Sequence, residues 1–152
     1  MLKKESARFL ESLRRFKNLD PLKELLPISQ RDFMVLMIVQ EYCDKNEAVR
    51  PGLLAQCLDL SLPATSDMLK RQCDKGLIIK KTDPLDRRSY IVELSEQGKQ
   101  IYIEGQELLT RFLETIIERY GKENMDRLLL VMDDIYQLMA VTKKEMLEEK
   151  DA

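Results

Sequence analysis

Two adjacent arginines, Arg87 and Arg88, are the residues whose type and position most clearly indicate a chemical role. They close the stretch Asp83–Arg88, in which Pro84 and two aspartates favour a turn and so place both guanidinium groups on a protruding loop. A guanidinium on such a loop suits the narrow, electronegative minor groove of DNA. The alternative is a surface ion pair between Asp86 and Arg88 that only closes a hairpin.

The flanks of this loop predict a β-hairpin. Two β-prone runs, Leu77–Lys81 and Ser89–Ser95, enclose it, and Gly76 can take the left-handed conformation that ends a helix just before them. A hairpin that directly follows a helix is the layout of a winged helix. The two arginines would then lie at the tip of the wing.

Two short helices are expected before the hairpin. Pro51 can start the first, predicted over Gly52–Leu58, and Ser61 can cap a second that has Pro63 in its first turn and runs to about Lys75. Two short helices joined by a tight turn form the helix-turn-helix pattern. The sequence therefore predicts the order helix, helix, strand, wing, strand.

The second helix of this pair has an inward and an outward face. Spacing turns Thr65, Met68 and Leu69 inward. The outward residues, which are expected to face DNA, are Pro63, Ala64, Ser66, Asp67 and Lys70.

Small side chains at the start of this outward face would let the helix enter a DNA groove closely. Ser66 could bond a base edge or a phosphate, Ala64 could touch a thymine methyl, and Lys70 could meet phosphate or guanine. Backbone N–H groups near Ser61 offer a further phosphate site. Asp67 either accepts a hydrogen bond from a cytosine amino group or lowers affinity by repelling phosphate, and both readings stay open.

Longer amphipathic segments surround this region. Apolar residues from Leu2 to Phe16 recur at helical spacing and predict a first helix that ends near Asp20-Pro21. Ser29 can cap a second helix that ends around residues 43–46, with too many apolar positions for a single stripe, so it is expected to be the central buried helix. After the hairpin, two long helices are predicted over Glu96–Tyr120 and from Lys122 to about Glu148, broken by Gly121.

The predicted fold class is mainly α with a small β-hairpin wing, in a single chain. About residues 28–95 form a winged helix-turn-helix lobe, and about residues 1–20 and 96–148 form a helical arm. The broad apolar stripes of the arm predict packing against a second copy of the chain, which makes the N- and C-terminal helices dimerisation helices. The alternative is an antiparallel helical hairpin that folds back on its own core.

Composition narrows the range of functions that the chain could have. The net charge of -2 and a pI near 5.4 do not favour indiscriminate binding to polyanions, yet residues 61–90 carry a net charge of +3. The sequence contains no histidine, which removes the commonest general base and transition-metal ligand. We therefore expect no enzyme activity, no bound metal and no cofactor.

Three cysteines, Cys43, Cys57 and Cys73, form no CxxC pair, and no apolar run is long enough to cross a bilayer. The cytoplasm is the expected location. The cysteines could act as a redox switch, although passive burial is favoured.

Four apolar residues form a candidate effector pocket between the lobe and the arm, or simply belong to the core: Phe16, Phe33, Met34 and Met37.

The order of elements resembles the MarR family of bacterial winged-helix transcription regulators over most of the chain. The residues that carry the resemblance are Gly76–Ile78 and, above all, the run from Asp83 to Gly98, which is similar to the wing signature of the family. The resemblance implies a homodimer assembled by the first, fifth and sixth helices, with a recognition helix in the major groove. It also implies that Arg88 reaches the minor groove, that Asp86 holds this arginine and that Arg87 meets phosphate.

Two residues depart from the family pattern. Gln72 stands where a buried leucine is usual, and the departure predicts a slightly rotated helix in which Cys73 supplies the apolar contact. Asp67 stands where many relatives carry a basic or neutral residue.

The expected function is a homodimeric, sequence-specific DNA-binding transcription regulator. We expect a repressor that binds double-stranded DNA at a pseudo-palindromic operator and is relieved by a small-molecule effector or an oxidant. The alternative function is a winged-helix module for protein–protein interaction that binds no operator.

Overall fold

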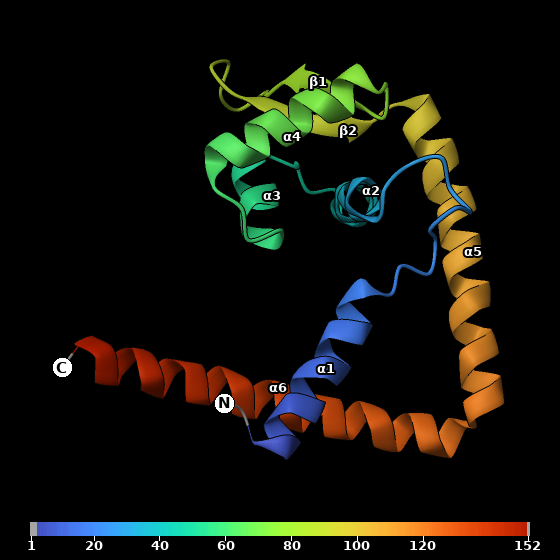
Figure 1. Ribbon diagram of the computed structural model, residues 1–152. Helices are drawn as coiled ribbons and strands as arrows, with labels where there is room; N and C mark the ends of the chain where they lie inside the picture. Colours follow the sequence, from blue (N-terminus) through green and yellow to red (C-terminus); the bar gives the residue numbers. More distant parts are fainter. Residues whose placement is uncertain (1–2, 152) are drawn as a thin grey trace. The chain divides into compact units, whose positions relative to one another are not determined.

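The structure is a computed structural model that describes residues 3–151 (Figure 1). The described elements are α1 (Lys4–Asn18), α2 (Gln30–Asp44), α3 (Pro51–Cys57), α4 (Leu62–Asp74), β1 (Ile78–Thr82), β2 (Tyr90–Leu94), α5 (Glu96–Tyr120) and α6 (Lys122–Asp151). This mainly helical fold with one antiparallel hairpin confirms the predicted class. The chain divides into two compact units, Met1–Leu109 and Thr110–Ala152, and the division falls within α5.

Helix α2 is the centre of the first unit. Ser29 caps it, because the Ser29 Oγ accepts a hydrogen bond from the backbone N–H of Asp32 at 3.1 Å. Val35, Leu36 and Val39 are fully buried, so α2 is covered on more than one side. Figure 1 shows α2 end-on between α3, α4, the hairpin and α5. The prediction of a central buried helix is confirmed.

The two helices of the helix-turn-helix follow local signals in the sequence. Pro51 lies in the first turn of α3, and the Ser61 Oγ caps α4 by accepting a hydrogen bond from the Ala64 N–H at 3.3 Å. After α4, Gly76 has a φ of 70°, the left-handed conformation that glycine adopts without steric cost. The cap and break positions predicted for this segment are confirmed.

The wing is a regular antiparallel hairpin in which Ile78 lies opposite Leu94 and Thr82 lies opposite Tyr90. Ile78 and Leu94 turn inward and are buried. The predicted strands were too long at three ends. Leu77 donates its N–H to the Gln72 carbonyl and lies in the turn that follows α4, Ser89 belongs to the turn of the wing, and Ser95 caps α5.

The start of α5 is fixed against the end of α4. The Ser95 Oγ accepts a hydrogen bond from the Gly98 N–H at 2.9 Å and donates one to the Gly76 carbonyl, while the Ser95 N–H bonds the Leu77 carbonyl at 3.1 Å. Gly98 is buried beneath that same Leu77 carbonyl, where there is no room for a Cβ. The hairpin therefore ends in a close contact between backbones.

The second unit contains the end of α5 and all of α6. Gly121 separates the two helices with a φ of 88°, as predicted, and α6 continues three residues beyond its expected end at Glu148. No described residue of α6 is buried. None of the described helices is both long and apolar enough to cross a membrane.

The close contact at Gly98 yields a test of the fold. In a Gly98→Ala variant the new Cβ would collide with the Leu77 carbonyl oxygen, so we expect the free energy of unfolding to fall by about 1–3 kcal/mol. Gly52→Ala is the matched control, because a Cβ at this position in α3 meets no atom within 4 Å and should be neutral or stabilising by about 0.5–1 kcal/mol. Urea unfolding of both variants measures the difference, and equal stabilities would contradict this packing.

Candidate nucleic-acid interface

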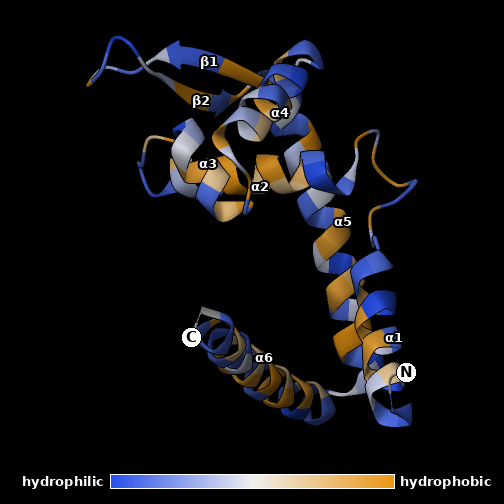
Figure 2. Ribbon diagram, turned by 60° about the vertical axis from the view of Figure 1, so that its left-hand side comes forward, coloured by the Kyte–Doolittle hydropathy of each residue, from blue (hydrophilic) through white to orange (hydrophobic). Residues whose placement is uncertain are grey.

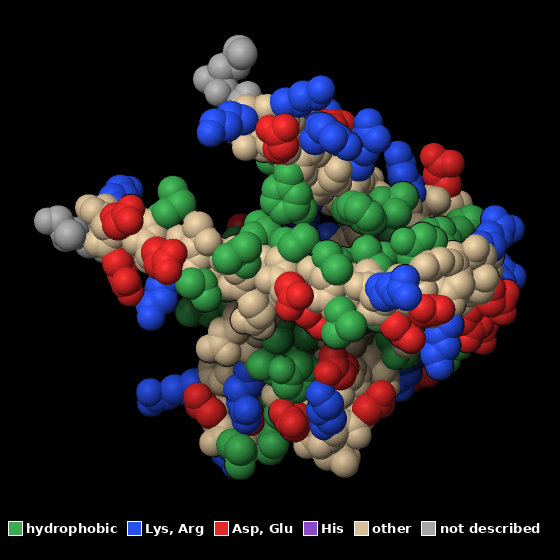
Figure 3. All heavy atoms as spheres, turned by 90° about the horizontal axis from the view of Figure 1, so that it is seen from below, with side chains coloured by type: hydrophobic (Ala, Val, Ile, Leu, Met, Phe, Trp, Pro, Cys, Tyr) green, Lys and Arg blue, Asp and Glu red, His purple; other side chains and the backbone are tan. Residues whose placement is uncertain are grey.

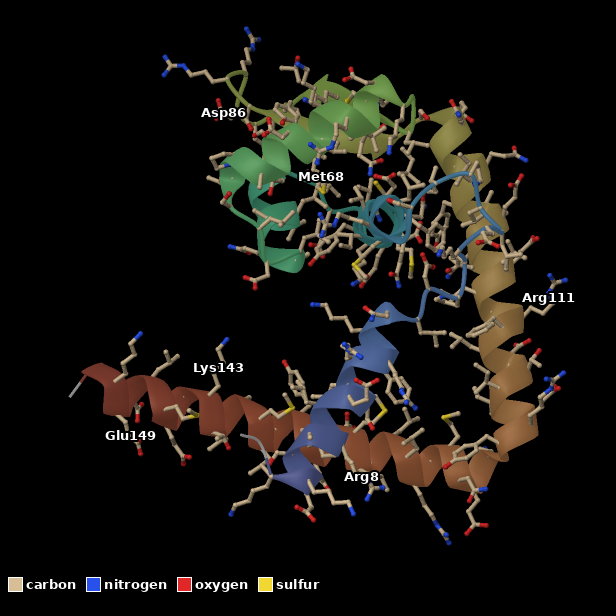
Figure 4. All side chains as sticks on the ribbon, viewed as in Figure 1. Arg8, Met68, Asp86, Arg111, Lys143 and Glu149 are labelled. Atoms are coloured by element: carbon tan, nitrogen blue, oxygen red, sulfur yellow. The ribbon has the colours of Figure 1, made fainter. Side chains whose placement is uncertain are left out.

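The outward face of α4 is exposed as its spacing predicted. Thr65, Met68 and Leu69 are at most 3% exposed, and Figure 4 shows Met68 on the side of α4 that faces α2. The Thr65 Oγ1 also donates a hydrogen bond to the Ser61 carbonyl at 3.0 Å, which holds the first turn of the helix. The predicted DNA-facing residues are all exposed: Ser61, Pro63, Ala64, Ser66, Asp67 and Lys70.

The wing tip is fixed by its backbone, while its arginines are exposed. The Asp86 Oδ1 accepts a hydrogen bond from the backbone N–H of Arg88 at 2.9 Å, and the Asp86 carbonyl accepts one from the Ser89 N–H at 2.9 Å. This is an Asx turn, in which the aspartate shapes the loop. Figure 4 shows Asp86 on this loop, and Figure 2 shows the loop as largely hydrophilic.

The alternative of an ion pair between Asp86 and Arg88 is therefore wrong in its geometry. Among the ion pairs formed by the described residues, none joins these two side chains. Asp86 holds the main chain of Arg88, and the guanidinium group is left exposed beside that of Arg87. The same observation agrees with the role that the family resemblance implied for Asp86, which is to hold Arg88 in place, and shows that the contact is made to the backbone of the arginine.

The root of the wing contains a buried carboxylate. Asp83 is 1% exposed, and its Oδ2 accepts a hydrogen bond from the Nε of Arg50 at 2.6 Å. The other oxygen, Oδ1, accepts the N–H of Leu85 at 2.9 Å, and the Asp83 N–H bonds the Ser89 carbonyl at 3.2 Å. The Arg50 guanidinium, followed by the Leu85 N–H, lowers the pKa of Asp83 below its ordinary value. Arg50 directly precedes α3, so the pair ties the wing to the helix-turn-helix.

The structure overturns the prediction made from Gln72. This residue is fully buried, so α4 is not rotated to turn Gln72 outward, although the half-buried Cys73 does supply apolar contact by packing against the hydrophobic core. The Gln72 Nε2 donates a hydrogen bond to the Asp32 Oδ1 at 2.8 Å, and the Lys75 Nζ donates one to the Asp32 Oδ2 at 2.6 Å. Gln72 thus occupies the inward position itself, with a polar partner on α2.

Electrostatics at Asp32 show that this contact favours the charged carboxylate. Burial raises the pKa of Asp32, but hydrogen bonds from Lys75 and Ser29 outweigh it and leave the pKa below the ordinary value of 3.8. One atom of the cluster has no partner, because the buried Gln72 Oε1 accepts no hydrogen bond.

Cations on the candidate interface divide into paired and unpaired groups. Lys75 pairs with Asp32, Lys81 pairs with Glu93 at 2.6 Å, and the Lys80 ammonium lies 4.7 Å from the centre of the Tyr90 ring. Within residues 3–151, the ion pairs include neither Lys70 nor the two wing arginines. The pair with Arg50 removes one negative charge from residues 61–90, whereas the pairs of Lys75 and Lys81 remove two positive charges, so pairing lowers the net charge of this segment from +3 to +2.

The cysteines differ in environment. Cys57 is exposed, with its Sγ 3.9 Å from the Tyr42 hydroxyl, so the expectation of passive burial is wrong for this residue. Cys43 and Cys73 are half-buried, and burial raises the pKa of the Cys43 thiol. No cluster of His, Cys, Asp or Glu that could hold a metal ion occurs within the described part of the chain.

The residues of the candidate effector pocket lie in different surroundings. Met34 is 48% exposed and lines a hollow of about 290 Å³ with Gln30, Arg31, Leu58 and Leu60. Phe33 is buried, Met37 is half-buried, and Phe16 is 71% exposed on α1. The effector pocket stays a prediction.

Sequence reasoning treated Asp83 only as a turn residue and missed Arg50, Asp32 and Lys75. The partners in these contacts are separated by 33 to 43 residues. No spacing pattern relates residues so far apart in the sequence. A single signal was available, the amide of Gln72 on the apolar face of a predicted helix, which calls for a buried polar partner.

The pairing at the wing root makes a prediction about pH. In an Arg50→Ala variant the pKa of Asp83 should rise, because its charge-assisted hydrogen bond is lost while the carboxylate stays desolvated. In the unaltered chain the ion pair stabilises the wing fully above pH 3.8, and this stabilisation is lost as the pH falls through the lowered pKa of Asp83. The variant lacks the pair, and its Asp83 becomes protonated at higher pH. Titration of the Asp83 carboxyl carbon by NMR measures the shift. Arg127→Ala, which removes an exposed arginine of α6, is the control, and an unchanged pKa in Arg50→Ala would contradict the assignment.

Comparison with known proteins places this geometry in a known fold. A scan against family models finds no match, and a search of curated proteins finds no significant one. Solved structures do match. A mutant of MarR from E. coli in complex with operator DNA has a TM-score of 0.67 at 20% identity, covering 87% of this chain and 94% of that one.

Two further structures agree. CouR, a transcriptional repressor bound to a 23-mer DNA duplex, has a TM-score of 0.66 at 26% identity, covering 88% of this chain and 92% of that chain. A mutant of MepR from S. aureus has a TM-score of 0.65 at 15% identity, covering 91% and 99%. The resemblance read from the wing sequence is thus confirmed in three dimensions, and the chain has the winged-helix fold of MarR-type transcription regulators.

Proposed function

We propose that this protein is a homodimeric, sequence-specific DNA-binding transcription regulator. The observation that carries the proposal is the shared exposure of two features on one lobe, the small-residue start of α4 and the arginine tip of the wing. Proteins of the same fold, MarR and CouR, are described in complex with DNA. The alternative of a protein-interaction module lacks a comparable observation.

In this proposal α4 is the recognition helix and enters the major groove. Ala64 and Ser66 are short enough to let the backbone approach the base edges, where Ser66 donates or accepts and Ala64 meets a thymine methyl. Lys70 reaches a phosphate or a guanine, and the N–H groups of the first turn near Ser61 meet the phosphate backbone. Asp67 is exposed beside them and selects cytosine by accepting a hydrogen bond from its amino group.

The wing reads the adjacent minor groove. Arg88 enters the groove, and Arg87 meets the flanking phosphate. Asp86 supports both by fixing the turn of the backbone, and Asp83 with Arg50 fixes the root from which the loop projects. The wing thereby presents its cations from a rigid loop, which lowers the entropy lost on binding.

A second copy of the chain covers the exposed apolar side chains of the helical arm. Several helices carry them: Phe9, Leu10, Leu13 and Phe16 on α1, Leu113, Ile116 and Ile117 on α5, and Leu129, Met132, Tyr136, Met139, Met146 and Leu147 on α6. Figure 3 shows that many hydrophobic side chains lie at the surface. Monomeric soluble proteins rarely expose so much apolar surface, whereas homodimers bury it in a symmetric interface.

Regulation follows from the dimer. Two recognition helices placed one turn of DNA apart, roughly 10 base pairs, read a pseudo-palindromic operator. A small molecule or oxidant that favours another spacing of the lobes lowers DNA affinity by its differential affinity for the two states, and release of a repressor is the expected result. This role is assigned to the cytoplasm, where the chromosomal operator and reduced thiols are found.

Selection from a random duplex pool tests the proposal. The purified full chain is incubated with the pool at near-physiological salt, because low salt admits non-specific binding. Enrichment of a pseudo-palindrome with half-sites about one helical turn apart is the expected result. No enrichment, from protein shown to be folded and dimeric by sedimentation, would favour the protein-interaction module.

The role of the wing is tested by Arg88→Ala. Specific binding to the selected duplex should weaken by about 1–3 kcal/mol, because a contact to the minor groove is lost. Arg127→Ala removes the same charge from a 72% exposed side chain on α6 and should leave affinity nearly unchanged. Fluorescence anisotropy measures both variants against the parent chain, and equal losses in the two would assign only a general electrostatic role to Arg88.

A further inference from the structure

A polar cluster with two buried members lies at the end of α4 that is farthest from its first, small-residue turn. It consists of Asp32 on α2 with Gln72 and Lys75 of the α4 terminus, and it is called the α2–α4 clamp below. Gln72 is fully buried and its Oε1 has no partner, so this position carries a desolvation cost that an apolar side chain would avoid. A buried polar residue that lowers stability is expected to serve a purpose other than packing, such as fixing the orientation of a helix.

The geometry of the clamp restricts two motions of α4. Gln72 and Lys75 donate to different oxygens of one carboxylate, at 2.8 Å and 2.6 Å, from positions almost one helical turn apart. In the body of α4, the buried contacts of Met68 and Leu69 are apolar and without direction. Apolar contacts alone permit the helix to rotate or slide, whereas two directed bonds to one carboxylate fix its rotation and its axial position.

The carboxylate itself is held by a rigid base. The Asp32 N–H is bonded by the Ser29 cap, and the next residue, Phe33, packs against Gly105 of α5 so closely that a Cβ at 105 would collide with its ring. Phe33 also stacks on Tyr102 of α5, with ring centres 6.4 Å apart. The clamp therefore fixes the orientation of α4 relative to both α2 and α5.

We propose that Asp32, Gln72 and Lys75 are positioning residues that set the sequence specificity of the α4 face without touching DNA. The inference rests on the proposed function, because it gives the clamp a role in the same DNA site. With α4 held in one orientation, Ser66 and Asp67 meet defined base edges, and bases that do not match leave these polar groups unpaired. Without the clamp, α4 still meets phosphates but discriminates less between sequences.

Exchange of the two polar groups tests the clamp. In Gln72→Glu two carboxylates meet at hydrogen-bond distance in a buried site, and we expect the ratio of specific to non-specific affinity to fall by about tenfold or more. The double variant Asp32→Asn/Gln72→Glu restores one carboxylate and one amide with their places exchanged, and should recover the ratio. Gln100→Glu, on an exposed part of α5, adds the same charge and should leave the ratio unchanged. A double variant no more specific than Gln72→Glu would overturn the proposal.

A second variant separates positioning from stability. Gln72→Leu removes the partnerless Oε1 and keeps a similar side-chain volume, but it also leaves the Asp32 Oδ1 without its donor. These two effects oppose each other, so the melting temperature of the variant should stay close to that of the parent. Its specificity ratio should nevertheless fall by about tenfold. A stable Gln72→Leu variant with the parental ratio would overturn the proposal.

A measurement made without DNA tests the positioning role of the clamp independently of the proposed function. Residual dipolar couplings of the backbone amides report the orientation of α4 relative to α2 in the parent chain and in Gln72→Leu. The parent should fit one common orientation, and the variant should show a changed or averaged orientation of α4. If the parent selects no DNA sequence, the proposed function fails while these couplings still decide whether the clamp positions α4, and identical couplings in both chains would refute it.

Discussion

Burial of α2 is the constraint on which the rest of the lobe depends. Val35, Leu36 and Val39 leave no exposed surface, so the helix must be covered on several sides at once. Residues from α4, the hairpin and α5 provide this cover, among them Leu69, Val92 and Ile101. Once these elements have turned their apolar sides to α2, the opposite face of α4 and the end of the hairpin are left to solvent, and these are the surfaces proposed to read DNA.

Directed polar contacts fix the relative orientation of the elements, which apolar packing alone does not fix. Two buried carboxylates, Asp32 and Asp83, are each paired with a cation whose own side chain is about half exposed. Each joins elements far apart in the sequence, Asp32 connecting α2 to the end of α4 and Asp83 connecting the wing root to the start of α3. Because these bonds have direction, they define orientation where hydrophobic contacts define only proximity. The two proposed reading elements are thus each tied to the helices of the core by one buried carboxylate.

The sequence predicted what depends on neighbouring residues. Ser29, Ser61, Gly76 and Gly121 each act within one turn of their own position, and the helix boundaries that they mark agree with the structure. The inward and outward faces of α4 were predicted for the same reason, since helical periodicity alone determines them. Strand ends were predicted less well because hydrogen bonds between distant residues decide them, as at Leu77.

Contacts between distant residues escaped prediction. Nothing in the spacing of Arg50 and Asp83 reveals that they meet, and the only ion pair that the residues of the wing suggested, between Asp86 and Arg88, does not form. Gln72 was noticed as unusual, but its partner Asp32 lies 40 residues earlier, and the helix rotation inferred from it was wrong. Burial of a single small residue such as Cys57 depends on the same distant packing, and its exposure was likewise not foreseen.

The central claim is that one lobe places α4 in the major groove and the wing in the adjacent minor groove. Dimethyl sulfate footprinting tests it most directly, because the reagent methylates guanine N7 in the major groove and adenine N3 in the minor groove. On a duplex that the protein selects, the account predicts two patches of guanine protection about one helical turn apart, each with protected adenines beside it that become reactive in Arg88→Ala. Guanine protection without any minor-groove protection, or adenine protection unaffected by this substitution, would contradict it.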